Sequence, residues 1–114
     1  MKNKVFVALA LVVVFAMVLS ACAPSASAGT IKVASDAAYP PFELVDETTK
    51  ELIGFDIDLF NAVAAKAGLD IEYVNIGFDP LLAGMAQCQY DVAISAITIT
   101  DERKQNMTFS DPYF

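Results

Sequence analysis

The chain has 114 residues, of which 14 are acidic, 7 are basic and none is histidine. A chain of this length builds one small domain at most, and its formal net charge of −7 makes it a poor partner for nucleic acid. Because the chain has no histidine, it lacks the usual ligand of transition metals and the general base of Ser-His or Cys-His catalysis. We therefore expect no metal and no cofactor.

Residues 1–21 have the pattern of a secretory signal peptide. A short basic start, MKNK, precedes the 15-residue apolar run VFVALALVVVFAMVL, and small residues follow it. A transmembrane anchor is the alternative, but the run is shorter than the ~20 residues that a membrane-spanning helix needs. We therefore expect the protein to be exported.

The stretch LSAC, which ends at Cys22, resembles a bacterial lipobox. The resemblance implies cleavage before Cys22 and a lipid anchor that holds the protein on the extracytoplasmic side of the membrane. An ordinary cleavage site with an incidental cysteine is the alternative. Residues 22–29 are small and rich in Pro, Ser and Ala, which predicts a flexible tether. Cys88 is then left alone, and we expect it to be a partly buried thiol without a disulfide.

The folded part begins at residue 30 with a strand and a break. Residues 30–36, TIKVASD, alternate apolar and polar side chains, which predicts a strand. Pro40 and Pro41 then forbid a helix locally. Residues 45–55 are polar in the middle and apolar at both ends, which predicts a hairpin or a loop.

Residues 56–68 give the clearest helix signal. Apolar side chains recur at helical spacing along one face, at Phe60, Val63, Ala64 and Ala67. Asp56 is predicted to cap the start of this helix and Gly68 to end it.

Two further strands and a second helix follow. Residues 70–75 alternate and predict a strand, and residues 78–87 predict a short helix with Asp79 as N-cap and Pro80 at the first helical position. Residues 91–97 form a near-continuous apolar run, which is typical of a strand buried on both faces of a parallel sheet.

The predicted order of elements is β, α, β, α, β, which indicates an α/β fold built from βαβ units with a parallel sheet. In such sheets ligands bind in the crevice beyond the carboxyl ends of the strands. We call this edge the rim. It is formed by the loops that follow the three strands, residues 35–42, 75–79 and 95–103.

The side chains of the rim suit a small polar ligand. Arg103 has a planar fork that can hold a carboxylate through two parallel hydrogen bonds. If Thr100 caps a helix, Arg103 lies in its first turn, where a cation is unfavourable by roughly 0.3–1 kcal/mol. A bound anion would remove this misfit. Ser95 and Thr98 add hydroxyls, and the aromatic side chains at the rim are Tyr39, Phe42 and Phe78.

Each of these residues also has a purely structural interpretation that the sequence leaves open. Arg103 could pair on the surface with Asp101 or Glu102. Tyr39 and Phe42 could be core aromatics, and Ser95 and Thr98 could be turn formers. Asp36 could cap a loop.

Three stretches together resemble the amino-terminal part of the family-3 extracellular solute-binding proteins of polar-amino-acid ABC transporters. They are IKVASDAAYPPFE, GFDIDLFNAVAAKAG and FDPLLAGMAQCQYDVAISAITITDERKQNMTFSDPYF. The resemblance covers residues 30–114 and implies part of the first lobe of a type II periplasmic-binding-protein fold. It also implies a protein that is not an enzyme, and that captures an amino acid and delivers it to a membrane permease.

The resemblance implies a ligand site made of Asp36, Tyr39, Phe78, Ser95, Ala96, Thr98 and Arg103. Arg103 resembles the arginine that clamps the α-carboxylate, and Thr98 resembles a second contact to the same group. Tyr39 and Phe78 resemble aromatics that stack on the ligand. Asp36 resembles an acid that meets a cationic ligand side chain or shapes the pocket in some relatives. Ser95 and Ala96 occupy strand-end positions that help to bind the ligand in the family.

The sequence departs from the family pattern in three respects. Ala96 stands where many relatives have serine or glycine, so one hydroxyl contact is absent. Cys88 and Gln89 replace a usual Gly-Lys pair. The family uses two lobes, and we expect this chain to be a fragment that stops before the second. A sensor domain or an enzyme module, such as a dehydratase or a peptidoglycan-lyase-associated domain, is the alternative, but no carboxylate pair is clearly poised as acid and base.

Overall fold

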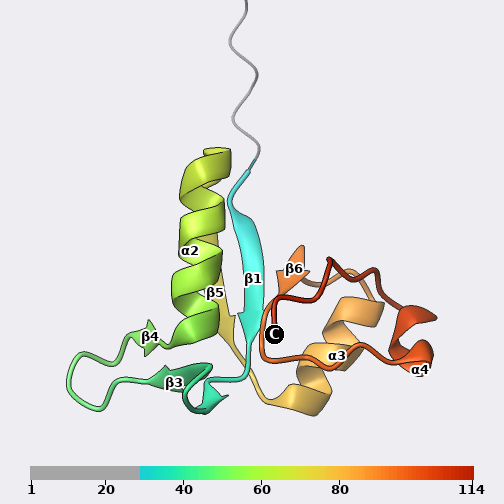
Figure 1. Ribbon diagram of the computed structural model, residues 1–114, viewed down its shortest axis with the longest axis horizontal. Coiled ribbons are helices and arrows are strands. Elements are labelled where there is room, and N and C mark those ends of the chain that lie inside the picture. Colours follow the sequence, from blue (N-terminus) through green and yellow to red (C-terminus); the bar gives the residue numbers. More distant parts are fainter. Residues whose placement is uncertain (1–28) are drawn as a thin grey trace, which may run out of the picture.

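The computed structural model describes residues 29–114, and Figure 1 shows its ribbon. The predicted signal peptide at residues 1–21 and the predicted lipid acceptor Cys22 lie outside the described residues. Within residues 29–114, no helix has the length and apolar character that crossing a membrane requires.

A three-stranded parallel sheet forms the centre of the molecule. Strand β1, Ile31–Ser35, lies between β5, Ile71–Asn75, and the short strand β6, Val92–Ala93. All three run in parallel, as the sequence predicts. The third strand is shorter than the predicted residues 91–97. The predicted strand cannot extend through Ala96, because its φ of 44° does not fit a strand.

A small antiparallel sheet is inserted between β1 and the first helix. It has the order β2-β3-β4, with bounds Ala38–Tyr39, Glu43–Val45 and Leu52–Ile53. The pairing of β3 with β4 confirms the predicted hairpin. Asp46 shapes its turn, because its Oδ1 atom accepts hydrogen bonds from the backbone N–H groups of Thr48 at 2.8 Å and Thr49 at 2.7 Å.

Helix α2, Phe55–Ala67, confirms the first predicted helix, and Gly68 ends it in the left-handed conformation. The prediction that Asp56 caps the helix is wrong, because Gly54 is the N-cap and makes no side-chain cap. The first amide groups bond instead to neighbouring backbone, with Phe55 N–H donating to Pro41 O at 3.0 Å. A side-chain cap is therefore not needed, and Asp56 is free to point inward.

Helix α3, Phe78–Ala86, begins two residues earlier than the capping pattern predicts. Gly77 is its N-cap, so the assignments of Asp79 as cap and Pro80 as first helical residue are wrong. Cys88 follows the helix in a tight turn with a φ of 54° and is exposed, which contradicts the predicted partly buried thiol.

The core lies between the central sheet and its two longer helices. Its buried apolar residues are Val33, Ala34, Ile57, Ala64, Leu81 and Ile94. Of the predicted apolar face of α2 only Ala64 is buried, whereas Val63 is 49% exposed. Figure 1 shows α2 on one side of β1, with α3 and the short helix α4, Asp101–Lys104, on the other side.

Candidate ligand-binding site

The rim forms as predicted, because the three parallel strands end at the same edge of the sheet. Two hydrogen bonds that involve side chains join its loops. The Ala37 N–H donates to Asn75 Oδ1 at 3.1 Å, and the Asp36 N–H donates to Ser95 Oγ at 3.0 Å. Residues far apart in the sequence are thereby held side by side.

Arg103 is held at the rim by three contacts. Thr100 caps α4, and its Oγ1 accepts from the Arg103 N–H at 3.2 Å. The guanidinium donates from Nη1 to Thr98 O at 2.7 Å. Its central carbon lies 5.2 Å from the centre of the Phe78 ring, which is a cation–π distance. The structure therefore brings together Thr98, Phe78 and Arg103.

The surface pairing of Arg103 with a neighbouring acid does not form. Asp101 pairs instead with Lys104, with Nζ and Oδ1 3.2 Å apart. That is the one ion pair among residues 29–114, so the guanidinium has no carboxylate partner there. The cation thus stays available to an anion from outside.

Ser95 and Ala96 lie beside this group, but their polar atoms are already engaged. Ser95 is buried, and its hydroxyl donates to Glu43 Oε1 at 2.9 Å while accepting from the Asp36 N–H. The Ala96 N–H donates to Asp56 Oδ2 at 2.7 Å. Both residues therefore support the rim from beneath. The Ser95 hydroxyl and the Ala96 N–H are not free to bind a ligand.

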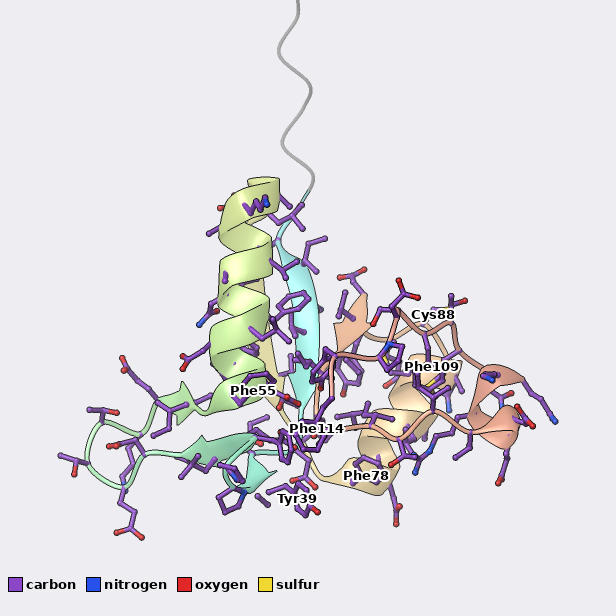
Figure 2. The ribbon with its side chains drawn as sticks, in the orientation of Figure 1. Tyr39, Phe55, Phe78, Cys88, Phe109 and Phe114 are labelled. Carbon is purple, nitrogen blue, oxygen red and sulfur yellow. The ribbon has the colours of Figure 1, made fainter. Side chains whose placement is uncertain are left out.

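The aromatic side chains divide into two groups. Tyr39 is 62% exposed and stacks on Phe42, with ring centres 5.9 Å apart. Phe42 itself packs edge-on against Phe55 and Phe114. Figure 2 shows Tyr39 and Phe78 on the same side of the molecule, whereas Cys88 lies away from them, nearer to Phe109. Most of the Tyr39 side chain is thus open to a ligand, whereas Phe42 lies inside an aromatic cluster.

Asp36 is half-buried at the end of β1. Its backbone is tied to Ser95, but its carboxylate accepts no hydrogen bond from any side chain or backbone group in the described part of the chain. It is a negative group of the rim that is free to meet a ligand.

Two acidic side chains beneath the rim, Glu43 and Asp56, are not among the predicted site residues. Glu43 is 1% exposed and Asp56 is fully buried. Burial raises the pKa of Glu43 from 4.5 to about 7, and the nearby charge of Asp56 acts in the same direction. Tyr113 donates its hydroxyl to Asp56 Oδ2 at 2.9 Å, and burial raises the pKa of Tyr113. The sequence feature that could have indicated these two acids is an acidic residue directly after a phenylalanine, in PFE at residues 41–43 and in GFD at residues 54–56.

A cavity of about 390 Å³ opens between the loop after β6 and the C-terminal segment. Its walls are formed by Phe42 together with residues 96–99 and 109–114. Arg103 does not line this cavity. We therefore define the candidate site by the guanidinium and its aromatic neighbours, because binding a carboxylate requires that group.

A parallel α/β lobe with a cation and aromatic side chains at its carboxyl edge defines a class of small-molecule-binding proteins. The family model of the bacterial extracellular solute-binding proteins, family 3, matches residues 31–114. The chain belongs to this family, as the resemblance predicts.

Named relatives support the assignment. The chain is 42% identical over 108 residues to the probable histidine-binding protein of Neisseria gonorrhoeae, covering 87% of this chain and 40% of that protein. It is 38% identical over 96 residues to the arginine-binding periplasmic protein of Mannheimia haemolytica, covering 84% and 40%. The chain thus spans about 40% of the length of these curated relatives.

Solved structures share the fold. The arginine-, lysine-, histidine-binding protein ArtJ from Geobacillus stearothermophilus superposes with a TM-score of 0.71 at 52% identity, covering 75% of this chain and 36% of that chain. The arginine-bound form of domain 1 from TmArgBP gives 0.70 at 43%, covering 75% and 68%. The predicted type II periplasmic-binding fold is therefore confirmed for the described part of the chain.

Proposed function

We propose that this chain provides the first lobe of an extracytoplasmic substrate-binding subunit of an ABC importer. It captures an amino acid, with Arg103 clamping the α-carboxylate, and delivers it to a membrane permease. The observation that carries the proposal is a guanidinium fixed at the rim without a carboxylate partner among residues 29–114. Its role is binding and not catalysis, in keeping with the names of the relatives.

The state of Arg103 supports the carboxylate clamp. Arginine has five N–H donors, and the structure gives one of its terminal nitrogens a partner, Thr98 O. Phe78 lies against the guanidinium and limits its movement. The remaining donors can bind both oxygens of a carboxylate at little further cost in side-chain entropy. Thr98 is exposed, so its hydroxyl can add a contact to the same group.

A basic amino acid is the proposed substrate. Relatives and neighbours are named for arginine, lysine or histidine binding. Asp36 has a free carboxylate that can meet a cationic side chain, and the exposed ring of Tyr39 can stack on a guanidinium or imidazole. Ser95 and Ala96 contribute by holding the loop that carries Thr98.

The proposal includes export and anchoring. The basic, apolar and small segments of residues 1–21 support a signal peptide, and LSAC supports a lipid on Cys22. A tether at residues 22–29 would hold the lobe near its permease. Metabolic labelling with a radioactive fatty acid tests this, since Cys22→Ser is expected to abolish the label, and an unchanged label would contradict it.

Calorimetry with L-arginine tests the clamp. Arg103→Ala is expected to lower the affinity by at least about 30-fold, because losing one partner of a charged hydrogen-bonded pair costs roughly 2–5 kcal/mol. Lys104→Ala is the matched control, because it removes an adjacent positive charge of the same helix. Equal affinity of the Arg103→Ala variant and the unaltered chain would refute the clamp.

A further inference from the structure

Two buried carboxyl groups hold the loop after β6 in place. Ser95 Oγ donates to Glu43 Oε1 at 2.9 Å, and the Ala96 N–H donates to Asp56 Oδ2 at 2.7 Å. Ala96 has a φ of 44°, an unfavourable conformation for alanine that a neighbour must maintain. The shape of the rim at this point therefore depends on two acidic side chains that do not face the ligand.

Each carboxyl group also has one oxygen left over. Glu43 Oε2 and Asp56 Oδ1 are buried and have no hydrogen-bond partner within residues 29–114. The two groups are neighbours, because they bond to the adjacent residues Ser95 and Ala96. A hydrogen bond between the two carboxyl groups is one of the causes that raise the pKa of Glu43. Ionised carboxylates only accept hydrogen bonds, so this bond forms only when one group carries a proton. Burial raises the pKa of Glu43 to about 7, which favours Glu43 as the site of that proton.

The surroundings do not offset two negative charges. Asp36, in the loop after β1, adds a further negative charge that raises the pKa of Glu43. Tyr113, from the C-terminal segment, is a neutral donor to Asp56. No lysine or arginine pairs with either acid in the described part of the chain. A shared proton removes one of the two charges without any further group.

We propose that Glu43 and Asp56 are positioning residues of the rim and share one proton at neutral pH, which fixes Ser95 and Ala96. When the proton leaves, two like charges face each other in a buried space and push β3 and α2 apart at this point. The loop after β6 then loses its fixed shape. The shared proton does not depend on the function proposed above, whereas its effect on ligand binding rests on that function.

The shared proton is tested by a carboxyl ¹³C NMR titration of the whole chain in detergent, from about pH 4 to about pH 9. Glu43→Gln identifies the resonance, because glutamine keeps an oxygen for Ser95 and brings an NH₂ group for Asp56. Glu47→Gln, an exposed glutamate of the same hairpin, is the control. The expected midpoint for Glu43 is about 7, and a midpoint near the ordinary 4.5 would overturn the shared proton.

The positioning role is tested by calorimetry with L-arginine at about pH 6 and about pH 8. If only the protonated pair binds, affinity falls about tenfold between these values, because the competent fraction falls by that factor. The Glu43→Gln variant is expected to bind equally at both, and Glu47→Gln to follow the unaltered chain. If the NMR midpoint of Glu43 is near 7 but the affinity for L-arginine does not change with pH, the positioning role is overturned. Absence of arginine binding at either pH would count against the proposed function, while the NMR titration still decides the proton.

Discussion

Replacing Ser95 by alanine removes a hydroxyl that joins three segments beneath the rim. In the unaltered chain this hydroxyl donates to Glu43 Oε1 at 2.9 Å and accepts from the Asp36 N–H at 3.0 Å. Ser95 is 4% exposed, so water cannot readily replace it. The substitution therefore leaves one buried acceptor and one partly buried donor without partners.

The expected loss of stability follows from these two groups. A buried polar group that loses its partner costs about 1–3 kcal/mol, and the half-buried Asp36 N–H lies at the lower end of this range. We expect Ser95→Ala to lower the free energy of unfolding by about 2–4 kcal/mol. The hydrogen bond from Ser95 also lowers the pKa of Glu43, so the substitution should raise that pKa further.

Urea denaturation followed by circular dichroism measures this loss. Ser110→Ala is the matched control, because Ser110 is exposed and its hydroxyl bonds only to the adjacent Asp111 O. The control should change the free energy of unfolding by less than about 0.5 kcal/mol. A loss of this small size for Ser95→Ala as well would refute the view that Ser95 holds the rim together.

Two further predictions concern the fold. Gly54→Ala is expected to destabilise the chain by more than about 1 kcal/mol in the same assay, because Gly54 has a φ of 126° and a Cβ there would meet backbone atoms of Phe42 and Pro41; unchanged stability would contradict this, and Gly29→Ala, with open space around it, is the control. The free energy of unfolding should fall as the pH rises from about 4.5 to about 7, by at most about 1.4 kcal/mol per pH unit, because Glu43 binds its proton more tightly in the folded chain. Glu43→Gln should remove this slope, and an identical slope in that variant would show that another group causes it.

The strand and helix pattern of this chain could be predicted from local sequence. Apolar periodicity located β1, β5 and α2, and a capping pattern located α3. The order of these elements predicted a parallel sheet whose strands end at a common edge. The caps were less accessible. Asp56 and Asp79 have the right residue type, but a glycine is the N-cap of each helix, and at α2 the preceding loop supplies the carbonyl oxygens that accept the first N–H groups. A capping pattern reports only local chemistry, whereas these partners come from the tertiary fold.

The candidate site divides in the same way. Arg103, Thr98 and Phe78 could be named from the sequence, because a charge misfit at a helix start and loop aromatics are local signals. The role of Ser95 could not, since its partner Glu43 lies 52 residues earlier in the chain. The pairing of Glu43 with Asp56 likewise depends on how β3 meets α2. Sequence patterns indicate which groups are unusual, but the fold decides whether they face a ligand or each other.

A comparison of L-arginine with agmatine, which is arginine without its α-carboxylate, tests the carboxylate clamp most directly. Calorimetry on the unaltered chain should detect binding of L-arginine and an affinity for agmatine at least about 30-fold weaker. The Arg103→Ala variant should no longer distinguish the two compounds. Equal affinities of the unaltered chain for L-arginine and agmatine would contradict the account, because Arg103 would then have no carboxylate to hold.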